Sequence, residues 1–392
     1  MRAVGIITEY DPFHAGHAWQ IAQAKQMGAE TVAVCMSADV TLRGGVALLP
    51  PQIRAKAALQ MGADLVIALP NPCAVQSAEA FAAAGVAALS ALPQLDTLVF
   101  GAETPDAEGL CQVAEVLQKP EFFAGVRERN QKGLSFAAAR AEVASRLHPR
   151  AAEILASPNN NLGVEYCKAI AMQQSHLRPV PIQRVGAAHG QQTPGENGFA
   201  SASMLRRLWH SQGAQALAEY VPERALELYR QAEQQGLGLN QNAFDLAALS
   251  RLRGMTLEQI AATRETAEGL EHRLMRVLRT ATSLQELYDG MKTKRYTHAR
   301  LRRYVLCAVL GYTDALEKTP PYLHILGATK AGFALLKGAT LPADTSLAAL
   351  EKTTPQAGRM AKAHAAAADF AALCREKPGP MGQSYTQSPV LW

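Results

Sequence analysis

Thr8-Glu9-Tyr10-Asp11-Pro12-Phe13-His14-Ala15-Gly16-His17 is the stretch that decides the fold of this chain. Before it, Arg2 to Thr8 is a short apolar run, typical of a strand buried on both faces of a parallel sheet. Asp11-Pro12 ends that run, and apolar residues then recur at helical spacing from Gly16 to Gly28. We therefore predict a strand, a turn and a helix, with the two histidines at the helix N-terminus.

Those histidines would lie where a phosphate group binds well. A helix N-terminus presents unpaired N–H groups and a partial positive charge. Imidazoles placed there can donate to phosphate oxygens, and Gly16 lets a ligand approach because it lacks a Cβ. Two other interpretations stay open for the motif alone, surface histidines at a helix start and a metal-binding pair. The other candidate metal ligands are scattered, so the metal-binding pair is the least favoured of the three interpretations, and we assign no residue as a metal ligand.

Composition indicates a soluble globular protein. The chain has 392 residues, 48% of them hydrophobic, which suggests two or three domains with a real core. No apolar run approaches the roughly 20 residues of a membrane span, and the N-terminus begins a strand rather than a signal peptide. We expect a cytoplasmic protein without a membrane partner. The six cysteines are dispersed and form no C-x-x-C pair, so reduced core thiols are expected.

Strands and helices alternate through the first half of the sequence. Further buried strands are predicted at residues 31–36, 64–69, 96–100 and 180–185, with helices between them. This order predicts an α/β fold with a right-handed, parallel, doubly wound sheet, whose ligands lie beyond the carboxyl ends of the strands. We place this domain at residues 1–215 and a mainly helical domain at 216–392, where Tyr322 to Leu326 is a possible short strand.

A second candidate phosphate site follows the last predicted strand of the first domain. In Ser201-Ala202-Ser203-Met204-Leu205-Arg206, small hydroxyl residues precede a helical run. Hydroxyls and free N–H groups at a helix start can hold phosphates, and an arginine one turn later can neutralise them. Taken alone, the same pattern also fits an ordinary helix N-cap.

The net charge of +5 is unevenly distributed along the chain. Between His272 and Arg303 there are nine Lys or Arg residues and two acids. A basic segment in a nearly neutral protein favours a polyanionic partner, with Tyr296 and Tyr304 available to stack on an unpaired base. The alternative is a solvated helical face.

Several motifs carry a resemblance to a known family. D-P-F-H-A-G-H resembles the signature of the H-x-G-H nucleotidyltransferase superfamily, and the serine-rich stretch resembles its second signature. More closely, the whole chain resembles the bacterial tRNA(Met) cytidine acetate ligases. This likeness is carried by Q-S-A-E-A-F from Gln76, F-G-A-E from Phe100, P-N-N-N-L-G from Pro158, R-V-G from Arg184 and K-T-K-R-Y-T from Lys292.

The resemblance implies a fold, a reaction and a set of ligands. The fold is a Rossmann-like nucleotidyltransferase domain followed by a mainly helical, tRNA-binding domain. The reaction is a carbon–nitrogen ligation in which acetate and ATP form acetyl-adenylate. The acetyl group then passes to cytidine 34, the wobble position of elongator tRNA(Met), as N4-acetylcytidine. ATP and Mg²⁺ are the implied cofactors, and the sequence leaves the oligomeric state open.

The resemblance also assigns roles to residues. Catalytic roles fall to His14, His17 and Arg206. The ATP-binding set is Ile7, Thr8, Glu9, Tyr10, Asp11, Pro12, Phe13, His14, Ala15, Gly16, His17, Ala18, Trp19, Gln20, Gly101, Asn159, Asn160, Arg184, Ser201 and Ser203. The tRNA-binding set is Lys292, Lys294, Arg295, Tyr296, Arg300 and Arg303.

One loop departs from the family pattern. Asp39 and Gly45 stand where relatives carry Asn and Glu, and a carboxylate near phosphates is unfavourable unless it binds Mg²⁺ or points away. One alternative is therefore an inactive, nucleotide-sensing RNA-binding protein that has lost its chemistry through Asp39 and Gly45. A second is a small-molecule adenylyltransferase of the same superfamily, which accounts for His14 and His17 but leaves the basic segment without a role.

Overall fold

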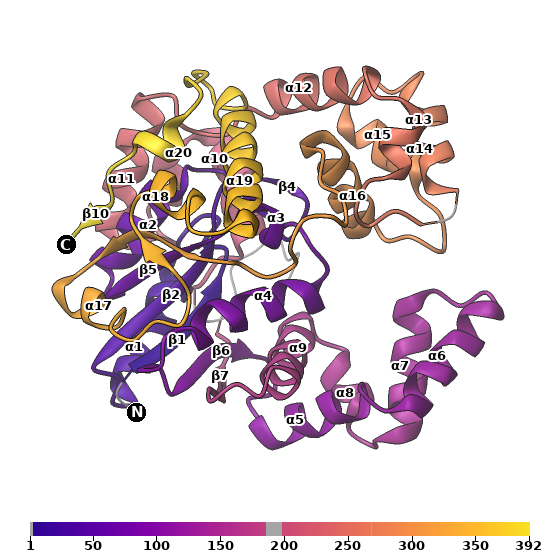
Figure 1. Ribbon diagram of the computed structural model, residues 1–392, viewed down its shortest axis with the longest axis horizontal. Coiled ribbons are helices and arrows are strands. Elements are labelled where there is room, and N and C mark those ends of the chain that lie inside the picture. The colour runs from indigo at the N-terminus through magenta and orange to yellow at the C-terminus, as the bar shows by residue number, and fades with distance from the viewer. Residues whose placement is uncertain (1–2, 186–197, 268) are drawn as a thin grey trace.

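The fold is built around one sheet, which lies in the left half of the view in Figure 1. The computed structural model describes residues 3–185, 198–267 and 269–392. The sheet has eight strands in the order β10-β8-β5-β2-β1-β6-β7, with β9 paired to β8. The strands are β1 Ala3–Thr8, β2 Thr31–Ser37, β5 Leu65–Leu69, β6 Thr97–Ala102, β7 Arg178–Gln183, β8 Leu323–Ala328, β9 Ala343–Asp344 and β10 Val390–Leu391.

The predicted parallel core is confirmed. β1 pairs in parallel with β2 and β6, β2 with β5, and β6 with β7. Because the chain runs from β1 outward to β2 and later returns to the other side of β1 with β6, the strand order reverses between β1 and β6. Ligands of doubly wound sheets bind at such a reversal, beyond the carboxyl ends of the strands.

The sheet differs from an all-parallel one at its β8 edge. β8 runs antiparallel to β5, and β10 is parallel to β8. The chain just after β8 lies close to the chain just before β5, since a Cβ on Gly332 would lie 1.8 Å from the Asp64 carbonyl oxygen. Thr329 N also donates to that oxygen at 2.8 Å. The segment from Leu323 onward, expected within the helical domain, therefore completes the α/β sheet instead.

Helices cover both faces of the sheet, and two groups of helices extend from it (Figure 1). Those around the sheet are α1 Ala15–Gln26, α2 Pro51–Gln60, α3 Asn71–Ala74, α4 Ala78–Ser90, α9 Pro158–Met172, α10 Ala202–Gln212, α11 Glu223–Gln234, α17 Lys330–Ala334, α18 Leu347–Glu351, α19 Pro355–Leu373 and α20 Gln383–Thr386. The first extension is α5 Ala107–Val116, α6 Pro120–Gln131, α7 Phe136–Leu147 and α8 Ala151–Leu155. The second is α12 Gln241–Arg253, α13 Leu257–Ala261, α14 Leu270–Leu278, α15 Leu284–Met291 and α16 His298–Leu310. A 3-10 turn, Ala214–Leu217, and a hairpin of β3 Val40–Thr41 and β4 Gly45–Val46 complete the elements.

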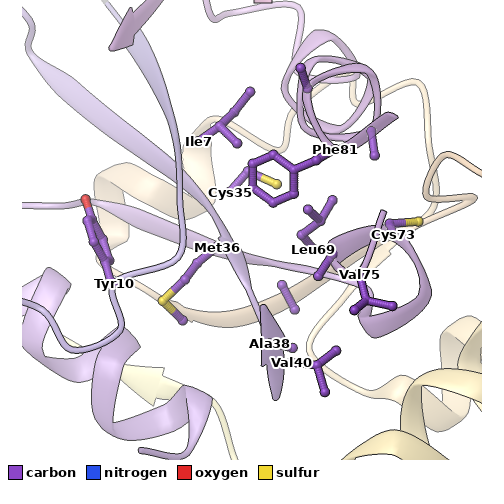
Figure 2. Close-up of a cluster of buried hydrophobic side chains, with 14 of the residues drawn as sticks. Ile7, Tyr10, Cys35, Met36, Ala38, Val40, Leu69, Cys73, Val75 and Phe81 are labelled. Atoms are coloured by element: carbon purple, nitrogen blue, oxygen red, sulfur yellow. The ribbon is translucent and has the colours of Figure 1, made fainter. Parts of the chain in front are cut away.

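Helix α4 packs closely against the first strands. Figure 2 shows Phe81 of α4 beside Ile7 of β1, with Cys35 and Leu69 of β2 and β5 close to its ring. All four side chains are buried. A Cβ on Gly85 would lie 2.7 Å from Ile7 Cδ1, so this glycine lets α4 approach β1 closely. The packing fixes the N-terminus of α4 beside the carboxyl end of β1.

All six cysteines are free thiols, and all except Cys111 are buried. Among the described residues, no helix is both long enough and apolar enough to cross a membrane.

Candidate active site

A pocket of about 400 Å³ lies at the carboxyl ends of β1, β6 and β7, between the N-termini of α1 and α10. A parallel, doubly wound sheet predicts a ligand at this position, beyond the carboxyl ends of its strands. Most of the expected ATP-binding and catalytic residues line it, namely Ile7, Thr8, Glu9, Tyr10, Asp11, His14, Gly16, His17, Trp19, Gln20, Gly101, Asn159, Arg184, Ser201, Ser203 and Arg206. The volume falls in the range of small-molecule sites.

The backbone of α1 fixes the orientation of the two histidines. His14 is the N-cap, and its Nδ1 accepts from Gly16 N at 3.1 Å. His17 Nδ1 accepts from His14 N at 3.2 Å, and the two rings stack with centroids 3.7 Å apart. Because each Nδ1 accepts a backbone N–H, the proton of each neutral ring lies on Nε2. Neither Nε2 has a hydrogen-bond partner among the residues that the structure describes, so both Nε2–H groups can donate to a ligand.

The pocket keeps both imidazoles neutral. Burial, with a smaller contribution from the nearby Arg184 guanidinium, lowers the pKa of His14 to about 3. Burial also lowers the pKa of His17 well below its ordinary value, with smaller contributions from His14 and Arg184. A negative charge bound between the two imidazoles and Arg184 would act against the lowering of both histidine pKa values. The pocket is therefore electrostatically complementary to phosphate.

Asp11 holds two arginines at the rim of the pocket. Its side chain is almost fully buried and forms an ion pair with Arg43 Nη2, while Arg206 Nη1 lies 3.5 Å from the same carboxylate oxygen. The other oxygen accepts from Leu48 N at 2.6 Å. Arg206 Nη1 also donates to the Asp11 carbonyl oxygen. Asp11 therefore positions both guanidiniums, and it has little capacity left to bind a ligand.

Arg43 was missing from the residues expected to bind ATP. It lines the pocket and lies 3.5 Å from Glu9 as well as beside Asp11. The sequence did contain a signal, because Arg43 and Gly44 keep the family pattern in a loop that otherwise departs from it. The contact could not be predicted, since it joins residues 32 positions apart.

The N-terminus of α10 also lines the pocket. Ser201 is its N-cap and accepts from Met204 N at 3.3 Å, while Ser201 Oγ and Ser203 Oγ are 3.0 Å apart. The capping interpretation and the ligand interpretation are thus compatible. One hydroxyl caps the helix, and the pair lines the pocket together with the first N–H groups of the helix.

Two aromatic side chains give the pocket an apolar surface suited to the flat face of a base. Phe100 and Tyr166 line it with ring centroids 5.3 Å apart. Gly101 follows Phe100 with no side chain in the way, and Asn159 is held by Glu103, whose Oε1 accepts from Asn159 Nδ2 at 2.6 Å.

Some residues expected to bind ATP do not line this pocket, namely Pro12, Phe13, Ala15, Ala18 and Asn160. Phe13 is fully buried and packs against Tyr10, and Ala15 N donates to the Tyr220 carbonyl at 2.9 Å. Asn160 is also buried, and its amide group bonds with Thr104 through both Oδ1 and Nδ2. Of the two asparagines, only Asn159 reaches the pocket.

Asp39 points away from the pocket. It is buried, and its Oδ2 accepts from Asn71 Nδ2 at 3.0 Å. It lines a separate small cavity beside His324, His364 and Arg375. The unfavourable placement of a carboxylate near phosphates is therefore avoided, which removes the main physical reason for suspecting an inactive protein.

The basic segment between α15 and α16 is largely solvent-accessible. Lys292, Lys294 and Arg295 are exposed and Arg300 is partly exposed. Arg303 is mostly covered and lies 3.9 Å from Glu265. The expectation that Tyr296 and Tyr304 could stack on a base is wrong, because both are buried core residues of the helical lobe. The guanidinium carbon of Arg300 instead lies over the Tyr296 ring, 5.1 Å from the ring centroid.

The described residues contain no group of three or more His, Cys, Asp or Glu side chains that could hold a metal ion. The carboxylates nearest the pocket are already engaged. Glu9 accepts from Leu42 N at 2.6 Å, and burial raises its pKa. Asp11 is paired as described above, so these side chains do not form a protein-built Mg²⁺ site.

Comparisons with known proteins agree with this geometry. The model of the HIGH Nucleotidyl Transferase family matches residues 1–383. The tRNA(Met) cytidine acetate ligase of Acetivibrio thermocellus is 31% identical over 415 aligned residues, covering 100% of both chains. The tRNA(Met) cytidine acetate ligase of Bacillus subtilis is 34% identical over 352 residues, covering 86% of this chain and 84% of the relative. The crystal structure of Thermotoga maritima TmcAL bound with alpha-thio ATP matches with a TM-score of 0.92 at 27% identity, over 100% of this chain and 99% of that chain.

Proposed function

This chain belongs to the HIGH nucleotidyltransferase family and, within it, to the tRNA(Met) cytidine acetate ligases, so we propose that it joins acetate to a tRNA cytidine with ATP. The product is N4-acetylcytidine at position 34 of elongator tRNA(Met), and acetyl-adenylate is the intermediate. The observation that carries this proposal is the pair of neutral Nε2–H donors of His14 and His17, which line one pocket together with Arg43, Arg184 and Arg206.

In the first step, an acetate oxygen attacks the α-phosphorus of ATP. The bond to the bridging oxygen breaks, and pyrophosphate leaves with the electron pair. Negative charge moves onto the leaving phosphates, where the imidazole N–H groups, Arg43, Arg206 and the N-terminus of α10 can stabilise it. Such a reaction needs positioning and fixed charge rather than a covalent nucleophile from the protein.

In the second step, the N4 amine of the cytidine attacks the acetyl carbonyl carbon. The carbon–oxygen bond to the phosphate breaks, AMP leaves, and the amine loses one proton. The exposed basic segment from Lys292 to Arg300 supplies a surface for the tRNA phosphates during this step.

Mg²⁺ enters the site with the nucleotide in this proposal. Mg²⁺ usually keeps several waters and binds substrate phosphates with few protein ligands. That mode is consistent with a pocket whose carboxylates already pair with Arg43 and backbone N–H groups. Equilibrium dialysis should therefore detect Mg²⁺ binding with ATP and none without it.

The deciding experiment is mass analysis of tRNA(Met) nucleosides after incubation with the protein, ATP, Mg²⁺ and isotope-labelled acetate. Labelled N4-acetylcytidine is the expected product. A dinucleotide made from a phosphate-bearing small molecule would instead identify an adenylyltransferase. Tight tRNA binding without any turnover would identify an inactive RNA-binding protein.

A further inference from the structure

A groove separate from the ATP pocket lies between α6–α7 and the basic segment. One part, of about 560 Å³, is bounded by α4, α6, α7 and α9, and a second part, of about 250 Å³, extends to the start of α16. Asn130, Phe136 and Arg295 line both parts, so the two form one surface, which we call the α6–α7 groove. In Figure 1, α6 and α7 extend to the same side of the molecule as α13 to α16.

The groove meets the ATP pocket at the N-terminus of α4. Ala78, the first residue of that helix, lines both cavities. Helix α9 is shared in the same way, because Asn161 and Leu162 face the ATP pocket whereas Glu165 and Lys168 face the groove. A ligand that fills the groove would therefore end beside the place where acetyl-adenylate forms.

Two aromatic side chains in the groove are unusually exposed. Phe123 of α6 is 56% exposed and Phe136 of α7 is 58% exposed. Both rings lie largely outside the core, whereas Phe122 and Val126 of α6 are buried in it. Exposed aromatic faces in a basic groove are typical of platforms on which unpaired bases stack.

The unpaired charges of the groove are all positive. Its two acids are neutralised, because Glu79 pairs with Lys168 at 2.6 Å and Glu165 with Arg140 at 2.8 Å. Within residues 3–185, 198–267 and 269–392, no carboxylate lies within ion-pairing distance of three other cations, which are Arg127, Arg295 and Arg300. A backbone of phosphates would complement them.

We propose that the α6–α7 groove binds the unpaired tRNA nucleotides next to the target cytidine, with one base stacked on Phe136. Arg127, Arg295 and Arg300 bind the phosphates on either side of that base. This inference rests on the proposed function and adds to it a base-stacking site on the catalytic domain, opposite the basic segment. A protein partner or a second copy of the chain would use the aromatic rings but would leave the three cations without a role.

The test compares tRNA affinity for groove variants and matched controls. Phe136→Ala should weaken tRNA(Met) binding by roughly tenfold, the scale of losing one base–aromatic stack, and Phe136→Trp should restore it. Arg127→Ala should lower the slope of log affinity against log salt by about 0.7, the value for one phosphate of a single strand. The controls are Phe333→Ala and Arg224→Ala, exposed side chains on α17 and α11 outside the groove.

Filter binding measures the affinities, and acetate-dependent ATP–pyrophosphate exchange is run on every variant. Retained exchange with weakened tRNA binding supports the groove. Unchanged affinity in Phe136→Ala and Arg127→Ala, with wild-type protein acetylating tRNA, would overturn it while leaving the proposed function intact. Absence of exchange and acetylation in the wild type would instead overturn the proposed function. Concentration-dependent dimerisation abolished by Phe136→Ala, with tRNA affinity retained, would assign the groove to a second copy.

Discussion

At the scale of single residues, the site depends on which atom of each histidine is left free. The backbone N–H groups of His14 and Gly16 occupy the two Nδ1 atoms, so chemistry is confined to Nε2. Because the pKa of His14 is low, about 3, the ring is uncharged at neutral pH and acts as a neutral hydrogen-bond donor.

Loss of either ring should therefore affect charge stabilisation during adenylate formation. We expect His14→Ala and His17→Ala each to lower acetate-dependent ATP–pyrophosphate exchange by about 10²-fold or more, the effect of removing one oxyanion-type donor. His272→Ala, which alters a histidine that is 69% exposed on α14, is the control. Unchanged exchange in both active-site variants would rule out the adenylation mechanism.

Arg43 gives a second prediction at this scale. Its guanidinium is held by Asp11 and Glu9 at the rim of the pocket, so Arg43→Ala removes one charged donor to the nucleotide. We expect the efficiency of the exchange reaction with respect to ATP to fall by about 10- to 100-fold, the usual effect of losing a hydrogen bond to a charged group. Arg43→Lys should recover little, because an ammonium group lacks the planar fork. Equal kinetics for wild type and Arg43→Ala would remove Arg43 from the site.

At the scale of elements, the parts predicted well are those that short stretches determine. The apolar runs of β1, β2, β5 and β6 and the starts of α1 and α10 are encoded locally, and the phosphate-binding place follows from them. The antiparallel pairing of β8 with β5 was not predictable, because it joins segments about 260 residues apart that are both simply apolar. The burial of Tyr296 and Tyr304 was missed because an aromatic residue between arginines fits a helix core as well as a binding surface.

The loop between α15 and α16 gives the prediction at this scale. Lys294 and Arg295 are exposed there, ahead of α16. If they bind tRNA phosphates, Lys294→Ala and Arg295→Ala should each reduce the salt slope by roughly one unit or slightly less, and the double variant by about twice that. Adenylation should persist because neither Lys294 nor Arg295 lines the ATP pocket. An unaltered slope in the folded double variant would return the loop to an unassigned role.

At the scale of the whole molecule, a buried polar cluster ties the C-terminal part to the first domain. His364 Nδ1 on α19 accepts from Asn71 N at 3.1 Å, and Asn71 in turn bonds with Asp39. His324 on β8 lies beside it, with ring centroids 5.8 Å apart. Burial lowers the pKa of each of these histidines to about 4. Both rings are therefore neutral in the folded protein.

These low pKa values predict a loss of stability in acid. Between pH 6.5 and about 4 the unfolded chain binds protons at these rings and the folded chain does not, so the free energy of unfolding falls as pH falls. Each ring contributes up to about 1.4 kcal/mol per pH unit. His364→Gln keeps an acceptor for Asn71 and should shrink the difference between pH 7 and pH 5 by about 2 kcal/mol in urea titrations. The exposed-site variant His272→Gln should keep the wild-type difference, and an equal pH dependence in His364→Gln would refute this assignment.

The late return of β8 to the sheet has a consequence for how the chain folds during synthesis. β5 is complete at Leu69, but the strand that covers its outer edge begins only at Leu323. Until the ribosome has released that segment, the nascent chain presents an apolar strand edge with unpaired backbone groups, which is a template for aggregation. Pairing across so long a loop is also slow, because the entropy of closing it must be overcome first. Chaperone dependence should therefore be greatest while residues 70–322 are emerging, and it should end when the last strands pair.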